Sequence, residues 1–135
     1  MQTQTLTPPT APAQWSLAEI QAALSRQIPP AMVSTRRQGG ATLTYIPWHV
    51  ANRILDKYAP GWTWEICSTT TTSDRLFLVG RLSIPTSEGT VYREATGTEL
   101  LICGSYGDPS SNAESMAFRR AAARFGLGLY LYEKD

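Results

Sequence analysis

Apolar residues recur at helical spacing near the start, in the middle and at the end of the chain. The first of these stripes follows a capping box of Ser16 and Glu19, and the Pro29-Pro30 pair ends it. The second begins at Pro47, where the missing N–H of proline costs nothing, and it closes at Pro60-Gly61. The pattern therefore predicts two helices before residue 62 and a third near the C-terminus.

Alternating apolar and polar residues predict five strands around these helices. Two short runs, Met32–Arg37 and Thr42–Ile46, flank Gly39-Gly40 and are typical of a β-hairpin. Three further runs are joined by short turns, which predicts an antiparallel meander. These runs are Trp62–Cys67, Leu76–Ile84 and Val91–Ile102. The order α-β-β-α-β-β-β-α predicts an α+β fold with the helices on one face of the sheet.

The last predicted helix covers roughly Asn112–Phe125 and begins at a second capping box, Ser111 with Glu114. Gly126 and Gly128 suit its left-handed end. Its apolar face is expected to pack on the sheet and comprises Phe118, Ala121, Ala122 and Phe125.

Length and composition fit a single domain. The chain has 135 residues, 42% of them hydrophobic, which is enough for one core. Residues 1–14 are largely Thr, Gln, Pro and Ala without an apolar period, so we expect a disordered tail followed by one domain over residues 15–135. No apolar run approaches the roughly 20 residues that span a membrane, so no membrane partner is expected.

The two cysteines bear on the compartment. Cys67 and Cys103 fall in segments predicted to be neighbouring strands. Such a pair is typical of reduced core thiols rather than of a disulfide. We therefore expect a reducing compartment, which is a cytoplasm, with the protein at its nucleoid, or the organellar equivalent.

The type of basic residue is more informative than the net charge of +1. All basic residues except Lys57 and Lys134 are arginines, whose planar donors suit phosphate. On the last helix Arg120 and Arg124 are separated by one turn, and Arg119 lies beside Arg120. A bound phosphate backbone would relieve the repulsion between these charges; a solvated basic face is the alternative.

A second basic site lies on the predicted hairpin. Arg36 and Arg37 come immediately before the Gly39-Gly40 turn. A protruding hairpin tipped by arginines can contact the backbone phosphates of a nucleic acid, although arginines near turns also serve solubility. Several aromatic residues are candidates to stack bases, with core or subunit contacts as the alternative: Trp48, Trp62, Trp64, Tyr92, Tyr130 and Tyr132.

Signals for enzymatic chemistry are poor. His49 is the only histidine, and no metalloprotease, nucleophile-elbow or phosphate-loop motif occurs. Glu94 and Glu99 lie on one strand at odd spacing, so they point to opposite faces and do not form an acid/base pair. Two cysteines and one histidine fall short of a structural zinc site. No metal, cofactor or catalytic residue is therefore expected.

Several of these segments occur together, and in the same order, in a known family. The set resembles the Rad52 superfamily of single-strand annealing proteins over about residues 15–132. It consists of Pro30–Arg36 (PAMVSTR), Gly39-Gly40, Tyr45-Ile46, Trp62, Gly97, Phe118–Ala121 (FRRA) and Phe125-Gly126.

The resemblance implies a β-β-β-α core, assembly into a ring, and a basic groove that holds one DNA strand by its backbone with the bases facing outward. Arg36 matches the groove arginine of the hairpin, and Tyr45 matches an aromatic near the groove. Arg119 and Arg120 match a basic pair on the last helix. Arg75 and Arg93 lie roughly where a second, outer DNA site would be.

One position departs from the family pattern. A further basic residue expected three positions after Arg120 is Ala123 here. Arg124 is one residue later and points about 100° away on a helix, so its replacement of that contact stays open. The chain ends soon after Tyr132, so no long C-terminal region that recruits other proteins is expected.

We therefore expect a homo-oligomeric ring that binds single-stranded DNA and anneals complementary strands in homologous recombination or double-strand break repair. A recombinase or a single-strand-binding protein is a further candidate partner. The alternatives are a double-stranded-RNA-binding module, which shares the final α-β-β-β-α order, and a structural subunit without a ligand. A third is a small metal-dependent nuclease that uses Asp74, Glu94 or Glu99.

Overall fold

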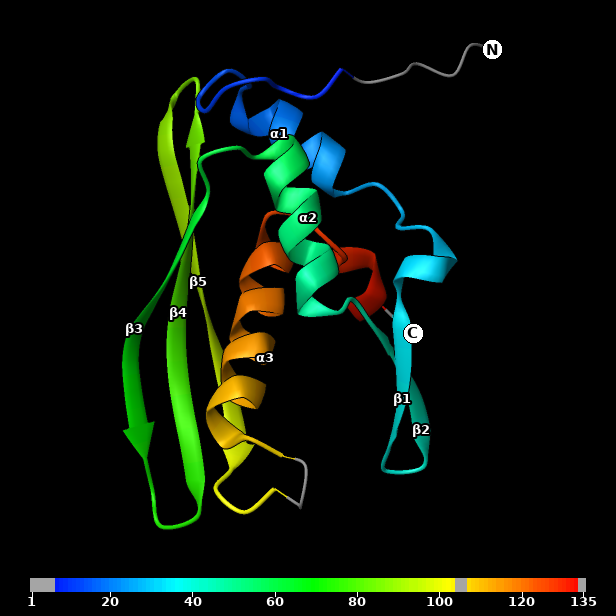
Figure 1. The fold of residues 1–135 in the computed structure, drawn as a ribbon, viewed down its shortest axis with the longest axis vertical. Coiled ribbons are helices and arrows are strands. Elements are labelled where there is room, and N and C mark those ends of the chain that lie inside the picture. Colours follow the sequence, from blue (N-terminus) through cyan, green and yellow to red (C-terminus); the bar gives the residue numbers. More distant parts are fainter. Residues whose placement is uncertain (1–6, 104–106, 134–135) are drawn as a thin grey trace.

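The computed structural model describes residues 7–103 and 107–133, and it confirms the predicted order of helices and strands. The chain is an α+β unit in which the helices lie on one side of a three-stranded sheet (Figure 1). The helices are α1 (Leu17–Leu24), α2 (Trp48–Tyr58) and α3 (Pro109–Arg124), with short 3-10 turns η1 (Pro30–Met32) and η2 (Leu129–Tyr132). The strands are β1 (Ser34–Gln38), β2 (Ala41–Tyr45), β3 (Thr63–Thr71), β4 (Arg75–Thr86) and β5 (Gly89–Leu100).

The strands form two separate antiparallel sheets. β3, β4 and β5 follow one another in space as they do in sequence, and Leu82 of β4 is paired with Trp64 and Arg93. β1 and β2 form the predicted hairpin, in which Arg36 is opposite Leu43. In Figure 1 this hairpin projects beside α3, on the side away from the sheet. The arrangement leaves the hairpin and α3 facing one another.

The core lies between the sheet and the helices. Leu82 and Ile84 of β4 are fully buried, together with Leu55 of α2 and Phe125 at the end of α3. The close approach of α3 to the sheet depends on Gly97 of β5, where a Cβ atom would lie 1.8 Å from the carbonyl oxygen of Ala113. α3 is therefore held directly on β5, and its remaining flank is free to form a site with the hairpin.

The structure corrects several predicted boundaries. α3 begins at Pro109, because the side chain of Asp108, rather than that of Ser111, caps it by accepting a hydrogen bond from the backbone N–H of Ser110. The Ser111 hydroxyl itself donates to Asp108. α1 ends at Leu24, well before the Pro29-Pro30 pair, and β5 ends at Leu100 rather than Ile102. The first turn of α3 is therefore capped by Asp108, and the capping box of Ser111 and Glu114 that the sequence indicated does not form the start of the helix.

The segment before α1 lies against the domain. Residues 7–14 have no helix or strand, yet Pro9 is buried and a Cβ atom at Gly61 would lie 2.9 Å from the side chain of Pro12. Prolines of this segment therefore contact the domain, and the division into a tail over residues 1–14 and a domain from residue 15 stays a prediction. Residues 1–6 lie outside the described residues.

The two cysteines are free, as expected, but they are not core residues. Cys67 is exposed on β3, at an irregularity in its pairing with β4, and Cys103 is partly buried beyond the end of β5. A strand bulge turns one thiol to solvent, and the early end of β5 leaves the other in a loop. In the described parts of the chain, no helix has the length and apolar character needed to cross a membrane.

Candidate nucleic-acid interface

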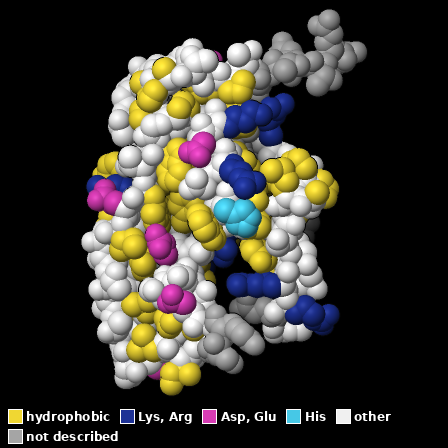
Figure 2. Space-filling view, viewed as in Figure 1, with side chains coloured by type: hydrophobic (Ala, Val, Ile, Leu, Met, Phe, Trp, Pro, Cys, Tyr) yellow, Lys and Arg dark blue, Asp and Glu magenta, His cyan; other side chains and the backbone are white. Residues whose placement is uncertain are grey.

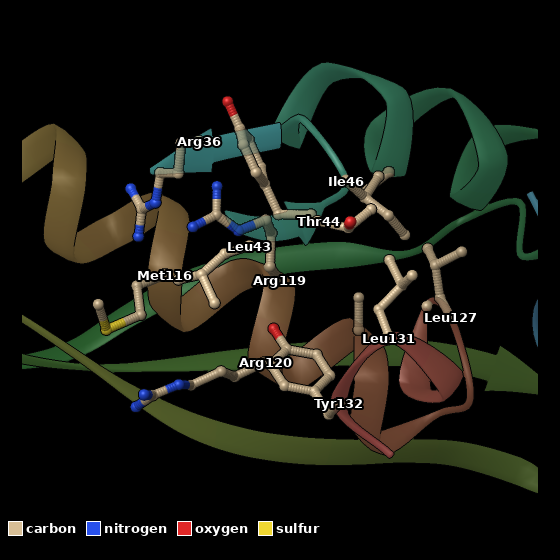
Figure 3. Close-up of a pocket in the computed structure, with 14 residues that line it drawn as sticks. Arg36, Leu43, Thr44, Ile46, Met116, Arg119, Arg120, Leu127, Leu131 and Tyr132 are labelled. Carbon is tan, nitrogen blue, oxygen red and sulfur yellow. The ribbon is translucent and has the colours of Figure 1, made fainter. Parts of the chain in front are cut away.

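A cavity of about 340 Å³ lies between the hairpin, α3 and the C-terminal turn η2. The hairpin contributes Arg36 of β1 and the consecutive residues Leu43, Thr44 and Tyr45 of β2. α3 contributes residues one turn apart, and η2 closes the far end. The residues labelled in Figure 3 that line this cavity are Arg36, Leu43, Thr44, Ile46, Met116, Arg119, Arg120, Leu127, Leu131 and Tyr132, and Tyr45 lines it as well.

Two arginines from different elements share one aromatic ring in this cavity. The guanidinium carbon of Arg36 on β1 lies 5.7 Å from the ring centre of Tyr45, and that of Arg119 on α3 lies 5.2 Å from it. Both distances are within the range of a cation–π interaction. Tyr45 therefore holds the two positive charges toward the same space.

Arg119 is partly buried, which changes its electrostatics. Burial lowers its pKa below the ordinary value for arginine, and the nearby charges of Arg36 and Arg120 lower it further. The ionisable phenol groups of Tyr132 and Tyr45 raise its pKa and so act in the opposite direction. An arginine remains protonated at neutral pH in spite of such a shift. Its positive charge is thus poorly solvated and repelled by its neighbours, and an anion placed here would relieve both effects.

Arg120 extends the basic surface at the edge of the cavity. Its side chain is exposed, and Nη1 donates to the carbonyl oxygen of Thr96 on β5 at 3.2 Å. In Figure 3 the side chain of Arg120 points away from Arg36 and Arg119, toward the sheet side of the cavity. Arg36, Arg119 and Arg120 therefore line one continuous surface. The first two point into the cavity, and Arg120 lies along its edge.

The other predicted arginines lie outside this cavity. Arg37 follows Arg36 on β1, so its side chain projects from the opposite face of the hairpin. Arg124 is exposed at the end of α3 and does not line the cavity, and Ala123 beside it is buried. Arg124 therefore lies outside the cavity, and whether it replaces the basic residue that the family pattern places at position 123 stays open.

Arg75 and Arg93 are not brought together within the chain. Arg75 begins β4 on the outer face of the sheet, where Nη1 donates to the hydroxyl of Thr98. Arg93 is on the helix-covered face, where its guanidinium stacks on Phe125 and donates to the carbonyl oxygen of Arg124. Arg93 thus neutralises the C-terminal end of α3, a structural contact that sequence spacing did not reveal.

Sequence reasoning missed the apolar floor of the cavity. Leu43 alternates with Tyr45 on β2, and Met116 precedes Arg119 by one helical turn. Both spacings place these residues on the same face as the basic ones, so the periodicity contained the signal. Leu131 gave no such signal, because a 3-10 turn after the last helix was not predicted.

The surface around the cavity is predominantly basic. Figure 2 shows lysine and arginine side chains on the hairpin and around the hollow beside it, whereas the acidic side chains of this face lie mainly toward the sheet. A cavity with arginines on two walls and an apolar floor suits a ligand with both phosphates and flat apolar groups. A stretch of single-stranded nucleic acid has this composition.

The carboxylates considered for a metal-dependent site lie apart, and no three His, Cys, Asp or Glu side chains are grouped among the described residues. Glu94 accepts two hydrogen bonds from Arg81 on the outer face of the sheet. Glu99 lies on the opposite face and accepts one from Asn112 of α3, which confirms that the two carboxylates do not meet. Asp74 accepts from the hydroxyl of Thr72 in the turn before β4.

Comparisons with known proteins agree with the resemblance seen in the sequence. A family model described as Rad52/22 family double-strand break repair protein matches residues 16–135. DNA repair RAD52-like protein 1, mitochondrial, of Arabidopsis thaliana is 41% identical over 129 residues, which are 94% of this chain and 73% of the relative. DNA repair RAD52-like protein 2, chloroplastic, of the same plant is 42% identical over 122 residues, which are 87% of this chain and 61% of the relative.

Proposed function

Because the chain belongs to the Rad52/22 family of double-strand break repair proteins, we propose that it binds single-stranded DNA in the cavity beside the hairpin and anneals complementary strands. The observation that carries this proposal is the stacking of Arg36 and Arg119 on Tyr45, which directs two guanidinium groups into one cavity. The role of the family in DNA repair and recombination makes DNA the polyanion to consider first.

The mechanism is positional and requires no covalent step. Arg36, Arg119 and Arg120 neutralise phosphates, while Leu43 and Met116 give the strand an apolar surface to lie on. A strand held by its backbone keeps the hydrogen-bonding edges of its bases free for a second strand. No cofactor is needed for this process, because pairing itself supplies the free energy of annealing.

We propose that residues 15–135 form one single-strand annealing domain and that copies of this domain assemble into a ring. β3 and β5 are the edges of the three-stranded sheet, and apolar side chains such as Phe77 and Ile102 are 43% and 90% exposed. Exposed apolar residues and open edges are features that neighbouring subunits cover. Around such a ring, the arginine cluster of each subunit would form a continuous basic track although a single chain carries a net charge of only +1.

The compartment and the protein partners follow from the same proposal. The relatives are named as mitochondrial and chloroplastic proteins. Free thiols and a role in DNA repair suit the nucleoid of a cytoplasm or the organellar equivalent. A recombinase or a single-strand-binding protein is the partner expected at the strand that is being annealed.

The experiment that tests the function measures the annealing of two complementary labelled oligonucleotides. Wild type is compared with the double variant Arg119→Ala/Arg120→Ala. The matched control is Arg26→Ala/Arg53→Ala, which removes two exposed charges outside the cavity. We expect acceleration by wild type and by the control, and a rate near the spontaneous one for the cavity variant.

Three results would contradict the proposal. If the cavity variant, still folded, anneals as fast as wild type, the DNA does not lie between the hairpin and α3. If duplex RNA displaces single-stranded DNA, the protein is an RNA-binding module. Cleavage of the oligonucleotide in the presence of Mg²⁺ or Mn²⁺ would identify a nuclease. Binding should also weaken steeply with salt, because contacts with phosphates release counterions.

A further inference from the structure

A second cavity, of about 310 Å³, lies on the other flank of α3 and is lined by aromatic rings. Trp48 and Asn52 of α2, Trp62 and Trp64 beside and within β3, and Phe118 of α3 form most of its wall. Figure 2 shows hydrophobic side chains between α2 and α3, with acidic side chains beside them. Among the described residues, none that lines this cavity is basic, so it differs in charge from the cavity beside the hairpin.

The walls of this aromatic cavity are fixed by hydrogen bonds to carboxylates. The indole Nε1–H of Trp64 donates to Oε2 of Glu114 at 3.0 Å, and that of Trp62 donates to Oδ1 of Asp56 at 2.7 Å. Phe118 lies against both rings, edge-on to Trp64 with centroids 5.2 Å apart and tilted against Trp62 at 5.7 Å. The rings therefore cannot rotate freely, and the cavity is formed before any ligand arrives.

The charges of the aromatic cavity exclude one class of ligand and favour another. Glu114 lines the cavity, and Asp56 is held against the outer part of Trp62. A nucleic-acid backbone would meet the carboxylate of Glu114 here, and no described residue of the lining is an arginine or a lysine that would offset it. A cation, in contrast, is attracted both by the carboxylate and by the faces of the tryptophan rings.

We propose that the aromatic cavity binds an arginine side chain of a partner protein. A guanidinium group is flat, so it stacks on an indole, and its donors match a carboxylate in the same plane. Trp48 is 54% exposed at the mouth of the cavity and provides the ring on which an entering side chain stacks. Glu114 uses one oxygen for Trp64 and keeps the other for the guanidinium.

The probe for this site is the peptide acetyl-Gly-Arg-Gly-amide, followed by calorimetry and by the NMR signals of the indole N–H groups. A matched peptide with citrulline has the same shape without the charge. We expect the arginine peptide to shift the indole signals of Trp48 and Trp64 and to bind at least about tenfold more tightly than the citrulline peptide.

The decisive variant is Glu114→Gln, because the glutamine oxygen still accepts the hydrogen bond from Trp64, while the negative charge and the second acceptor oxygen are lost. It should weaken binding of the arginine peptide about fivefold or more, and Trp48→Ala should weaken it similarly. Glu65→Gln on the outer face of the sheet is the charge control and should bind as wild type does. Circular dichroism verifies that each variant is folded.

Four outcomes would overturn the proposal. Equal binding of the citrulline peptide would mean that the positive charge is not recognised. Equal binding of a peptide with lysine in place of arginine would mean that the guanidinium group is not recognised. Preferential binding of adenosine or thymidine, unaffected by Glu114→Gln, would make the cavity a base site. A change in the oligomeric state of Trp48→Ala would mean that a neighbouring copy fills it. None of these measurements involves DNA annealing, so they stand apart from the test of the proposed function.

Discussion

The guanidinium carbon of Arg119 on α3 lies 5.2 Å from the ring centre of Tyr45 on β2, so the last helix and the hairpin meet through this pair. Arg36 approaches the same ring at 5.7 Å. The hairpin forms a sheet of its own, without strand pairing to β3, β4 or β5. The Tyr45 ring is therefore a direct link that fixes the position of both arginines relative to one another.

Replacing the ring at position 45 tests this link. Tyr45→Leu removes the aromatic face and should lower the affinity for single-stranded DNA about fivefold to tenfold, because each exposed cation–π contact contributes roughly 0.5–1 kcal/mol. Tyr45→Phe keeps the face and should bind within about twofold of wild type. Fluorescence anisotropy with a labelled oligonucleotide measures both. A Phe variant as weak as the Leu variant would show that the hydroxyl, and not the ring face, matters.

Neighbouring arginines on β1 provide a matched pair. Arg36 lines the cavity and Arg37 projects from the other face of the hairpin, so Arg36→Gln and Arg37→Gln remove the same charge from opposite sides. We expect Arg36→Gln to weaken binding about tenfold and to reduce the slope of affinity against salt by about 1. Arg37→Gln should change both much less. If the two variants are equivalent, only the total charge of the hairpin counts.

The order of helices and strands was predictable because periodicity and turn residues act locally. The Gly39-Gly40 turn and Pro47 each specify one junction, and the structure has the hairpin and α2 where these residues place them. The predicted start of α3 was wrong, because the Ser111-Glu114 pattern indicated a capping box, whereas the folded loop places the side chain of Asp108 as the cap. The prediction that Cys67 is a core residue was wrong as well, because the alternation of apolar and polar residues along a strand does not reveal a bulge.

The candidate site was predictable in part for similar reasons. The arginines of the last helix and Arg36 on the hairpin were singled out by their positions in the sequence, and the family resemblance added Tyr45. Stacking of two arginines on one ring was not predictable, since it depends on how the hairpin is placed against α3. The contact of Arg93 with Phe125 was not predictable for the same reason, and the outer DNA site proposed for Arg75 and Arg93 stays a prediction.

Gly97 controls how closely α3 lies on the sheet. In Gly97→Ala the new Cβ atom would lie 1.8 Å from the carbonyl oxygen of Ala113, so the helix must move away from β5. We expect a loss of roughly 1–3 kcal/mol in the free energy of unfolding, as is usual for an overpacked core. Urea denaturation measures this loss. The control Thr96→Ala lies one residue away on the exposed face and should stay within about 0.5 kcal/mol of wild type. Equal stability of both variants would contradict so close a contact.

Asp108 makes the stability of α3 dependent on pH. Hydrogen bonds from the Ser110 and Ser111 side chains lower the pKa of its carboxyl below the ordinary value of 3.8. A carboxylate with a lowered pKa stabilises the folded state above its unfolded pKa, and this contribution is lost as the pH falls through the folded value.

Asp108→Asn isolates this effect, because asparagine still caps the helix but does not titrate. The variant should have a lower Tm than wild type at neutral pH, and the difference should vanish as the pH falls below the folded pKa of Asp108. Thermal melts followed by circular dichroism between about pH 7 and pH 2 measure this convergence. Glu133→Gln removes an exposed carboxylate outside α3 and controls for the change in net charge. A difference between wild type and Asp108→Asn that persists unchanged into acid would mean that the charge of Asp108 does not stabilise the helix.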